Sequence, residues 1–103
     1  MTKVEWLRGQ LNKARVNWLC AFADYQAREG LDRTRASVMC DISVSTWHRV
    51  VKGEAPGLRS IFMLSKASGV PVEDFFKDNT QEQRDQIATV ALKFNEATDG
   101  NPN

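Results

Sequence analysis

The spacing of the apolar residues constrains the fold of this chain more than any other feature of its sequence. Wherever a clear periodicity is present, apolar residues recur at intervals of three and four, and no stretch alternates convincingly with a period of two. The three-to-four spacing gathers apolar side chains on one face of an α-helix, whereas alternation indicates a strand. We therefore predict an all-α chain.

Capping signals divide the chain into five or six helices. Thr2 followed by Glu5, and Thr80 followed by Gln83, are typical of capping boxes at helix starts, and Gly30 is a suitable helix stop. The sequence does not decide whether the first segment is one long helix or two helices with a break near residues 15–17. The predicted segments cover residues 3–28, 33–40, 44–52, 58–68, a helical turn at 71–76 and a last helix at 80–97. In the helix over 58–68, the residues predicted to face inward are Leu58, Ile61, Phe62, Leu64 and Ser65.

A chain of 103 residues has room for one domain with one core. We assign residues 1–98 to a single domain with its core in 20–77, terminal helices used for packing or dimerisation, and a disordered tail at 99–103. No apolar run is long enough to span a bilayer, and the first residues lack a signal-peptide pattern, so we expect a cytoplasmic protein. Cys20 and Cys40 lie within apolar helical patterns and are expected to be free thiols.

Charge is spread unevenly although the whole chain carries only +1. Residues 28–66 have a net charge of +3, the segment before them +2, and the segment after them −4. A basic middle beside an acidic end makes a dipolar molecule, and contact with phosphates needs only a local positive face. Ordinary scatter of surface charge is the alternative reading of this pattern.

Two short helices, over residues 33–40 and 44–52, are joined by the three-residue turn Asp41-Ile42-Ser43, which gives them helix-turn-helix proportions. The following residues continue an ordered series. In chain order it reads Ile42-Ser43-x-Ser45-Thr46, Gly53, Leu58-x-x-Ile61-x-x-Leu64-x-Lys66-Ala67-x-Gly69-Val70 and Val72-Glu73-Asp74-Phe75-Phe76. This stretch, somewhat under half of the chain, resembles the phage-repressor, Cro-like (XRE-type) helix-turn-helix family. The resemblance implies a lambda-repressor-like fold in the centre of the bundle and a DNA-binding function.

The chain departs from the family pattern in its short helices. Asp41 replaces the usual glycine of the turn, and it tolerates a left-handed backbone less well than glycine does. Trp47 stands at an aliphatic core position of the second short helix. The other departures are Arg33 for a frequent glutamine, Cys40 for leucine and Val51 for a frequent glutamate. Base specificity is therefore not carried over from any relative.

Helical geometry divides the helix over residues 44–52 into two faces. Trp47, Val50 and Val51 gather on an apolar face, which is expected to be buried, opposite a face of mainly polar residues. Arginine suits guanine edges, serine is an adaptable donor and acceptor, and valine can contact a thymine methyl group. The predicted base-contacting residues are Val44, Ser45, His48 and Arg49, and the predicted backbone-contacting residues are Arg33, Arg35, Ser43 and Lys52. Solvated surface positions are the alternative for Arg49 and His48.

The last helix carries an apolar stripe outside the family core. Its members, predicted to serve dimerisation or packing, are Ile87, Val90, Ala91 and Phe94. We expect this stripe to pack on Trp6, Leu7 and Leu11 of the first helix, within one chain or across a homodimer. A two-fold dimer would place two recognition helices about 34 Å apart, one turn of duplex, to match a near-palindromic operator.

These features together favour a sequence-specific transcriptional regulator, a repressor of phage, prophage or bacterial origin, that binds double-stranded operator DNA. One alternative is an antitoxin of a toxin–antitoxin pair, with the acidic C-terminal helix as its partner surface. Another is a protein-interaction adaptor or antirepressor. The sequence has no Gly-rich phosphate loop, no nucleophile–base–acid set and no zinc-type spacing, so we expect no enzyme, cofactor, metal site or membrane partner.

Overall fold

The computed structural model describes residues 1–99, with the side chains of residues 1–94. In this part of the chain the regular structure is entirely helical. The elements are α1 (Lys3–Glu29), α2 (Arg33–Cys40), α3 (Val44–Lys52), α4 (Leu58–Ser68), the 3-10 helix η1 (Val72–Phe76) and α5 (Gln81–Asp99). The all-α prediction is confirmed. Of the tail predicted at residues 99–103, Asp99 ends α5 and the remainder lies outside the described residues.

Side-chain caps account for where several helices begin. The backbone N–H of Glu5 donates to Thr2 Oγ1 at 3.1 Å, and α1 continues without a break through residues 15–17. At the start of α5, Gln83 N–H donates to Thr80 Oγ1 at 3.1 Å while Thr80 N–H donates to Gln83 Oε1 at 2.9 Å. Both bonds of a capping box are therefore present at this second site.

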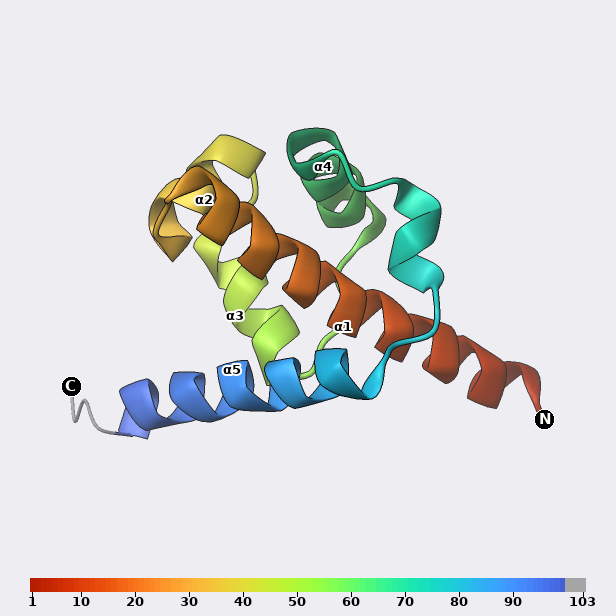
Figure 1. Ribbon diagram of the computed structural model, residues 1–103. Helices are drawn as coiled ribbons and strands as arrows, with labels where there is room; N and C mark the ends of the chain where they lie inside the picture. Colours follow the sequence, from red (N-terminus) through yellow and green to blue (C-terminus); the bar gives the residue numbers. More distant parts are fainter. Residues whose placement is uncertain (100–103) are drawn as a thin grey trace.

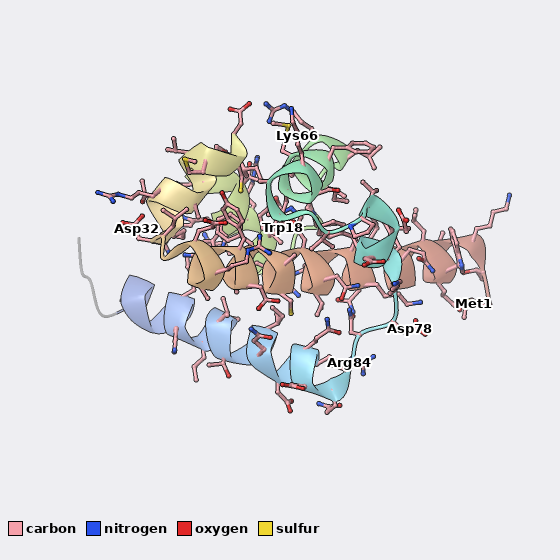
Figure 2. The ribbon with its side chains drawn as sticks, turned by 45° about the horizontal axis from the view of Figure 1, so that its top comes forward. Met1, Trp18, Asp32, Lys66, Asp78 and Arg84 are labelled. Carbon is pink, nitrogen blue, oxygen red and sulfur yellow. The ribbon has the colours of Figure 1, made fainter. Side chains whose placement is uncertain are left out.

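Helix α1 is the central element of the bundle (Figure 1). In both views α2, α4 and η1 lie on one side of α1 and α5 lies on the other (Figure 2). Residues 16–22 of α1 are all buried, because a helix enclosed by neighbours buries every face rather than one stripe. The rings of Trp18 and Phe22 stack with centroids 5.5 Å apart, and Trp18 Nε1 donates to Ser60 O at 3.2 Å.

A buried asparagine ties the segment around η1 to α1. Asn17 Nδ2 donates to the carbonyl oxygens of Phe75 and Lys77 at 3.1 and 2.8 Å. Its Oδ1 accepts from Asn79 Nδ2 at 2.8 Å. Because both ends of the amide have partners, this buried polar side chain holds the segment without an unsatisfied group.

Both cysteines are buried free thiols, as the sequence predicted. Burial, followed by the nearby Asp24 carboxylate, raises the pKa of the Cys20 thiol to about 11. The thiol therefore stays protonated at neutral pH, and its Sγ donates to Gln86 Oε1 of α5 at 3.7 Å. Within residues 1–99, no helix combines the length and the hydrophobicity that crossing a bilayer requires.

The prediction that Leu58 and Phe62 face inward is wrong. They are 66% and 55% exposed, whereas Ile61, Leu64 and Ser68 form the buried face of α4. Phe62 lies about 100° around the helix from Ile61. It therefore stands at one edge of the apolar stripe, and this edge faces solvent. Apolar spacing indicates the stripe but not which of its edges meets the core.

The predicted packing of α5 on Trp6, Leu7 and Leu11 does not occur within the chain. These three side chains are exposed, and α5 packs instead on the buried part of α1 and on α3. Its predicted stripe is used there: Ile87 is buried, and Val90, Ala91 and Phe94 pack against the core. The first turns of α1, residues 3–12, extend beyond the rest of the bundle (Figures 1 and 2). We call this segment the α1 arm.

Candidate nucleic-acid interface

Helix α3 is anchored by its apolar face, as predicted. Its buried residues are Trp47, Val50 and Val51, all members of the main core cluster. They recur at intervals of three and one, so they occupy one side of the helix and leave the other side for polar residues. The assignment of Trp47 to the core rather than to the surface is confirmed.

An arginine from α1 fixes the C-terminal end of α3. Arg15 Nε donates to Val50 O at 2.8 Å and its Nη2 donates to Val51 O at 3.1 Å. The last carbonyl groups of a helix have no partner within the helix, and a positive charge there also complements the helix dipole. Burial lowers the pKa of Arg15, but a guanidinium remains charged in proteins. Arg15 therefore sets the position of α3 relative to the central helix.

The turn before α3 is held from both of its ends. Asp41 adopts a left-handed backbone with φ 55°, and Ser43 caps α3 by accepting from Thr46 N–H at 3.2 Å. Arg59 of α4 donates to the carbonyl oxygen of Asp41 at 3.2 Å and contacts its carboxylate at 3.1 Å. Arg59 is thus engaged in holding the turn between α2 and α3.

The exposed face of α3 carries Ser45, Arg49 and Lys52. Arg49 Nη2 donates to Thr46 Oγ1 at 3.4 Å, and Arg49 Nε lies 3.7 Å from Glu54 Oε2. Neither Thr46 nor Glu54 is among the residues predicted to contact DNA. A signal for Thr46 was its position one helical turn before Arg49, where side chains meet. Glu54 has only the weaker signal of following the glycine that ends the helix.

The expectation that His48 faces outward is wrong. His48 and Val44 are half-buried, and the His48 ring lies 5.5 Å from that of Trp47 and 5.2 Å from that of Phe94 on α5. Its Nε2 is buried and, among the described residues, has no hydrogen-bond partner. For His48 the cause is tertiary, because Phe94 of α5 packs against its ring. Val44 and His48 are thus less exposed than Ser45 and Arg49.

The four predicted backbone-contacting residues, Arg33, Arg35, Ser43 and Lys52, are all exposed. Arg33 lies over the Trp47 ring with its guanidinium carbon 4.5 Å from the centroid, so this cation of α2 lies beside α3. Arg35 N–H donates to Asp32 Oδ1 at 2.7 Å, which caps the start of α2. Lys52 Nζ lies 5.9 Å from the centre of the Phe94 ring.

The arrangement offers hydroxyl and guanidinium donors on an anchored helix, with further cations beside it. Such groups hydrogen-bond to base edges and phosphates. Across the side chains that the structure describes, no group of three or more His, Cys, Asp or Glu residues could hold a metal ion. Comparison with protein-family models, with curated proteins and with solved structures finds no match to this chain.

Proposed function

We propose that this protein is a sequence-specific DNA-binding transcriptional regulator of the Cro-like helix-turn-helix kind, with α3 as its recognition helix. The observation that supports the proposal best is the exposed row of Ser45, Arg49 and Lys52 on a helix anchored by three buried residues and by Arg15. Rigid support matters because base readout needs side chains held at a defined depth in the groove. Repression follows when such a protein occupies an operator that overlaps a promoter.

Within this proposal Arg49 and Ser45 contact bases, and the neighbouring cations contact phosphates. Arg49 can present two parallel donors to guanine O6 and N7, and Ser45 is an adaptable donor or acceptor. Arg33, Arg35 and Lys52 supply positive charge around the same helix. Val44 and His48 have a smaller part in readout than the sequence predicted, because both are half-buried and the His48 ring packs against Phe94 of α5.

We also propose that the protein acts as a homodimer. The apolar stripe of α5 packs against the core of its own chain, whereas Trp6, Leu7 and Leu11 of the α1 arm are exposed. A second copy of the same arm is the occupant we favour, because a two-fold pair presents two recognition helices to a near-palindromic operator. The contact between the arms would be isologous, with each Leu7 near the same stripe of the other copy.

One observation supports a second candidate function. The outer side of α5 exposes Glu82 and Asp85 as well as the apolar Leu92. An acidic helix with an apolar residue suits a small basic protein, such as the toxin neutralised by an antitoxin, or the target of an adaptor or antirepressor. Copurification of a basic neighbour protein that is lost in the variant Glu82→Lys/Asp85→Lys would support this function.

Selection of bound DNA from a random duplex pool, followed by sequencing, tests the main proposal. The selection is made at about 150 mM salt, where purely electrostatic binding is weak. We expect enrichment of a two-fold symmetric motif, and we expect Arg49→Ala to lose the preference at one position of each half-site. Arg84→Ala, a change of the same kind at an exposed position of α5, serves as the matched control. Absence of any enriched motif with folded protein would contradict the proposal.

A further inference from the structure

We propose that Glu54 is a specificity-determining residue, which holds the Arg49 guanidinium in the orientation that reads guanine and at the same time weakens binding to every other sequence. The inference rests on the proposed function and deepens it. It begins from an ion pair at the end of α3, in which Arg49 Nε and Glu54 Oε2 are 3.7 Å apart. Their side chains are 62% and 66% exposed, so both can reach a bound duplex.

The backbone places Glu54 beside Arg49. Gly53 has φ 121°, a conformation that favours glycine, and it turns the chain back at the end of α3. Gly53 N–H donates to Val50 O at 3.1 Å, and Glu54 N–H donates to the carbonyl oxygen of Arg49 itself at 3.0 Å. This is the bond pattern of a Schellman cap. The backbone of Glu54 is therefore held beside that of Arg49 by the fold, and this brings its carboxylate within ion-pair distance of the guanidinium.

A second contact holds the guanidinium from the other side. Arg49 Nη2 donates to Thr46 Oγ1 at 3.4 Å, and Thr46 Oγ1 lies 2.8 Å from the capping hydroxyl of Ser43. A guanidinium has five N–H groups, of which one is on Nε and four are on the terminal nitrogens. Thr46 accepts from one N–H on Nη2, whereas the Glu54 carboxylate is an ion-pair partner of Nε at 3.7 Å without a hydrogen bond. Four N–H groups therefore remain for a base, enough for the two parallel bonds that guanine O6 and N7 accept.

The same carboxylate works against DNA that lacks the guanine. A negative charge at the groove repels phosphates, and on a non-cognate site no base contact offsets that repulsion. On a cognate site Arg49 is already oriented, so less side-chain freedom is lost when it binds the base. Glu54 thus lowers affinity for sites that lack the guanine and raises the difference between guanine and the other bases.

The test compares Glu54→Gln with the wild-type protein on two duplexes. The first duplex carries the motif selected from the random pool. The second is identical except at one position, the G·C pair that wild-type protein prefers and Arg49→Ala no longer prefers, which is replaced by A·T. We expect Glu54→Gln to bind the replaced duplex about threefold or more tightly, and to reduce discrimination between the duplexes about fivefold or more. In an Arg49→Ala background, Glu54→Gln should leave discrimination unchanged.

Glu29→Gln is the matched control. Arg28 Nε and Glu29 Oε1 form a similarly exposed ion pair at 3.8 Å, so the variant makes the same charge change at the end of α1. We expect it to keep full discrimination. Thr46→Val removes the other contact of Arg49 without changing charge, and it should also reduce discrimination while leaving non-cognate affinity unchanged.

The outcomes separate this inference from the function on which it rests. Wild-type protein that selects no motif overturns the proposed function, and the role of Glu54 falls with it. A wild-type motif with a guanine read by Arg49, together with unchanged discrimination in folded Glu54→Gln and Thr46→Val, overturns the role of Glu54 alone. Equal loss of discrimination in Glu29→Gln would also overturn it, because net charge would then explain the effect.

Discussion

The ring of His48 on α3 lies 5.2 Å from the ring of Phe94 on α5, with the two planes at 63°. Trp47 joins the cluster, with its ring 5.9 Å from that of Phe94. Edge-to-face contacts of this kind add to the free energy gained from burial alone. The C-terminal helix is therefore fastened to the flank of the helix that we propose to enter the major groove.

Acidification should weaken this cluster. Burial, and then the charges of Arg33 and Lys52, lower the pKa of His48 below its ordinary value of 6.5. The unfolded chain then binds more protons than the folded one as pH falls below about 6.5, so the free energy of unfolding decreases in that range and is unaffected above it. Urea unfolding at pH 7.5 and at pH 5.5 measures the effect. His48→Phe keeps the ring contacts and should lose this part of the pH dependence, and an equally steep decline in that variant would contradict the assignment.

The variant Phe94→Ala should weaken the packing of α5 on α3 and so lower the free energy of unfolding. Removing a half-buried ring that contacts two aromatic neighbours is expected to cost about 2 kcal/mol of unfolding free energy, less than for a fully buried phenylalanine. Leu92→Ala is the control, because Leu92 is on the same helix and is 59% exposed. It should change stability by less than about 0.5 kcal/mol. Equal effects of the two variants on chemical denaturation would show that Phe94 does not anchor the helix.

Arg15 should contribute more to the free energy of unfolding than Arg8, which lies in the α1 arm. Arg15→Met keeps much of the side-chain length but removes the arginine donor of Val51 O and one of the two donors of Val50 O, which keeps the Gly53 N–H, at a cost of about 2 kcal/mol. Arg8→Met makes the same substitution at an exposed position of the α1 arm and should be nearly neutral. Thermal and urea unfolding distinguish the two, and an Arg15→Met protein as stable as Arg8→Met would contradict the role of Arg15.

The α1 arm should control the oligomeric state. Leu7→Glu places a charge in the exposed apolar stripe and should convert the proposed dimer into a monomer without unfolding the chain, because Leu7 is outside the core. Light scattering at high micromolar concentration measures the change, with Gln81→Glu on exposed α5 as the control. A wild-type protein that is monomeric under these conditions would rule out pairing through the arm in the absence of DNA.

The bounds of the short helices were predictable because their signals are local. The sequence predicted α2 and α3 at residues 33–40 and 44–52, and both are observed there. Asp32 and Ser43 each bond to a backbone N–H three residues ahead, and Gly53 bonds back within its own helix. Each of these contacts joins residues close in sequence, so their chemistry can be recognised without knowledge of the fold.

The course of α5 was not predictable, because an apolar stripe does not indicate which other helix it packs against. Phe94 meets His48 from 46 positions away, and this contact changes the surroundings of a residue that a helical projection places on the outer face. Arg15 reaches carbonyl groups that lie 35 and 36 positions ahead in the sequence. Similarly, the pairing of Arg49 with Glu54 depends on the backbone turn at Gly53, which the spacing of side chains does not show.

Backbone amide chemical shifts, recorded while a short duplex of mixed sequence is added at about 50 mM salt, test the central claim most directly. Sequence-independent phosphate contacts form under these conditions, so the binding face can be located without knowledge of the operator. We expect the largest changes in residues 43–52 and at the start of α2, with small changes in the α1 arm and along the outer side of α5. Changes confined to the arm or to α5, or no changes with excess duplex, would contradict the assignment of α3 as a recognition helix.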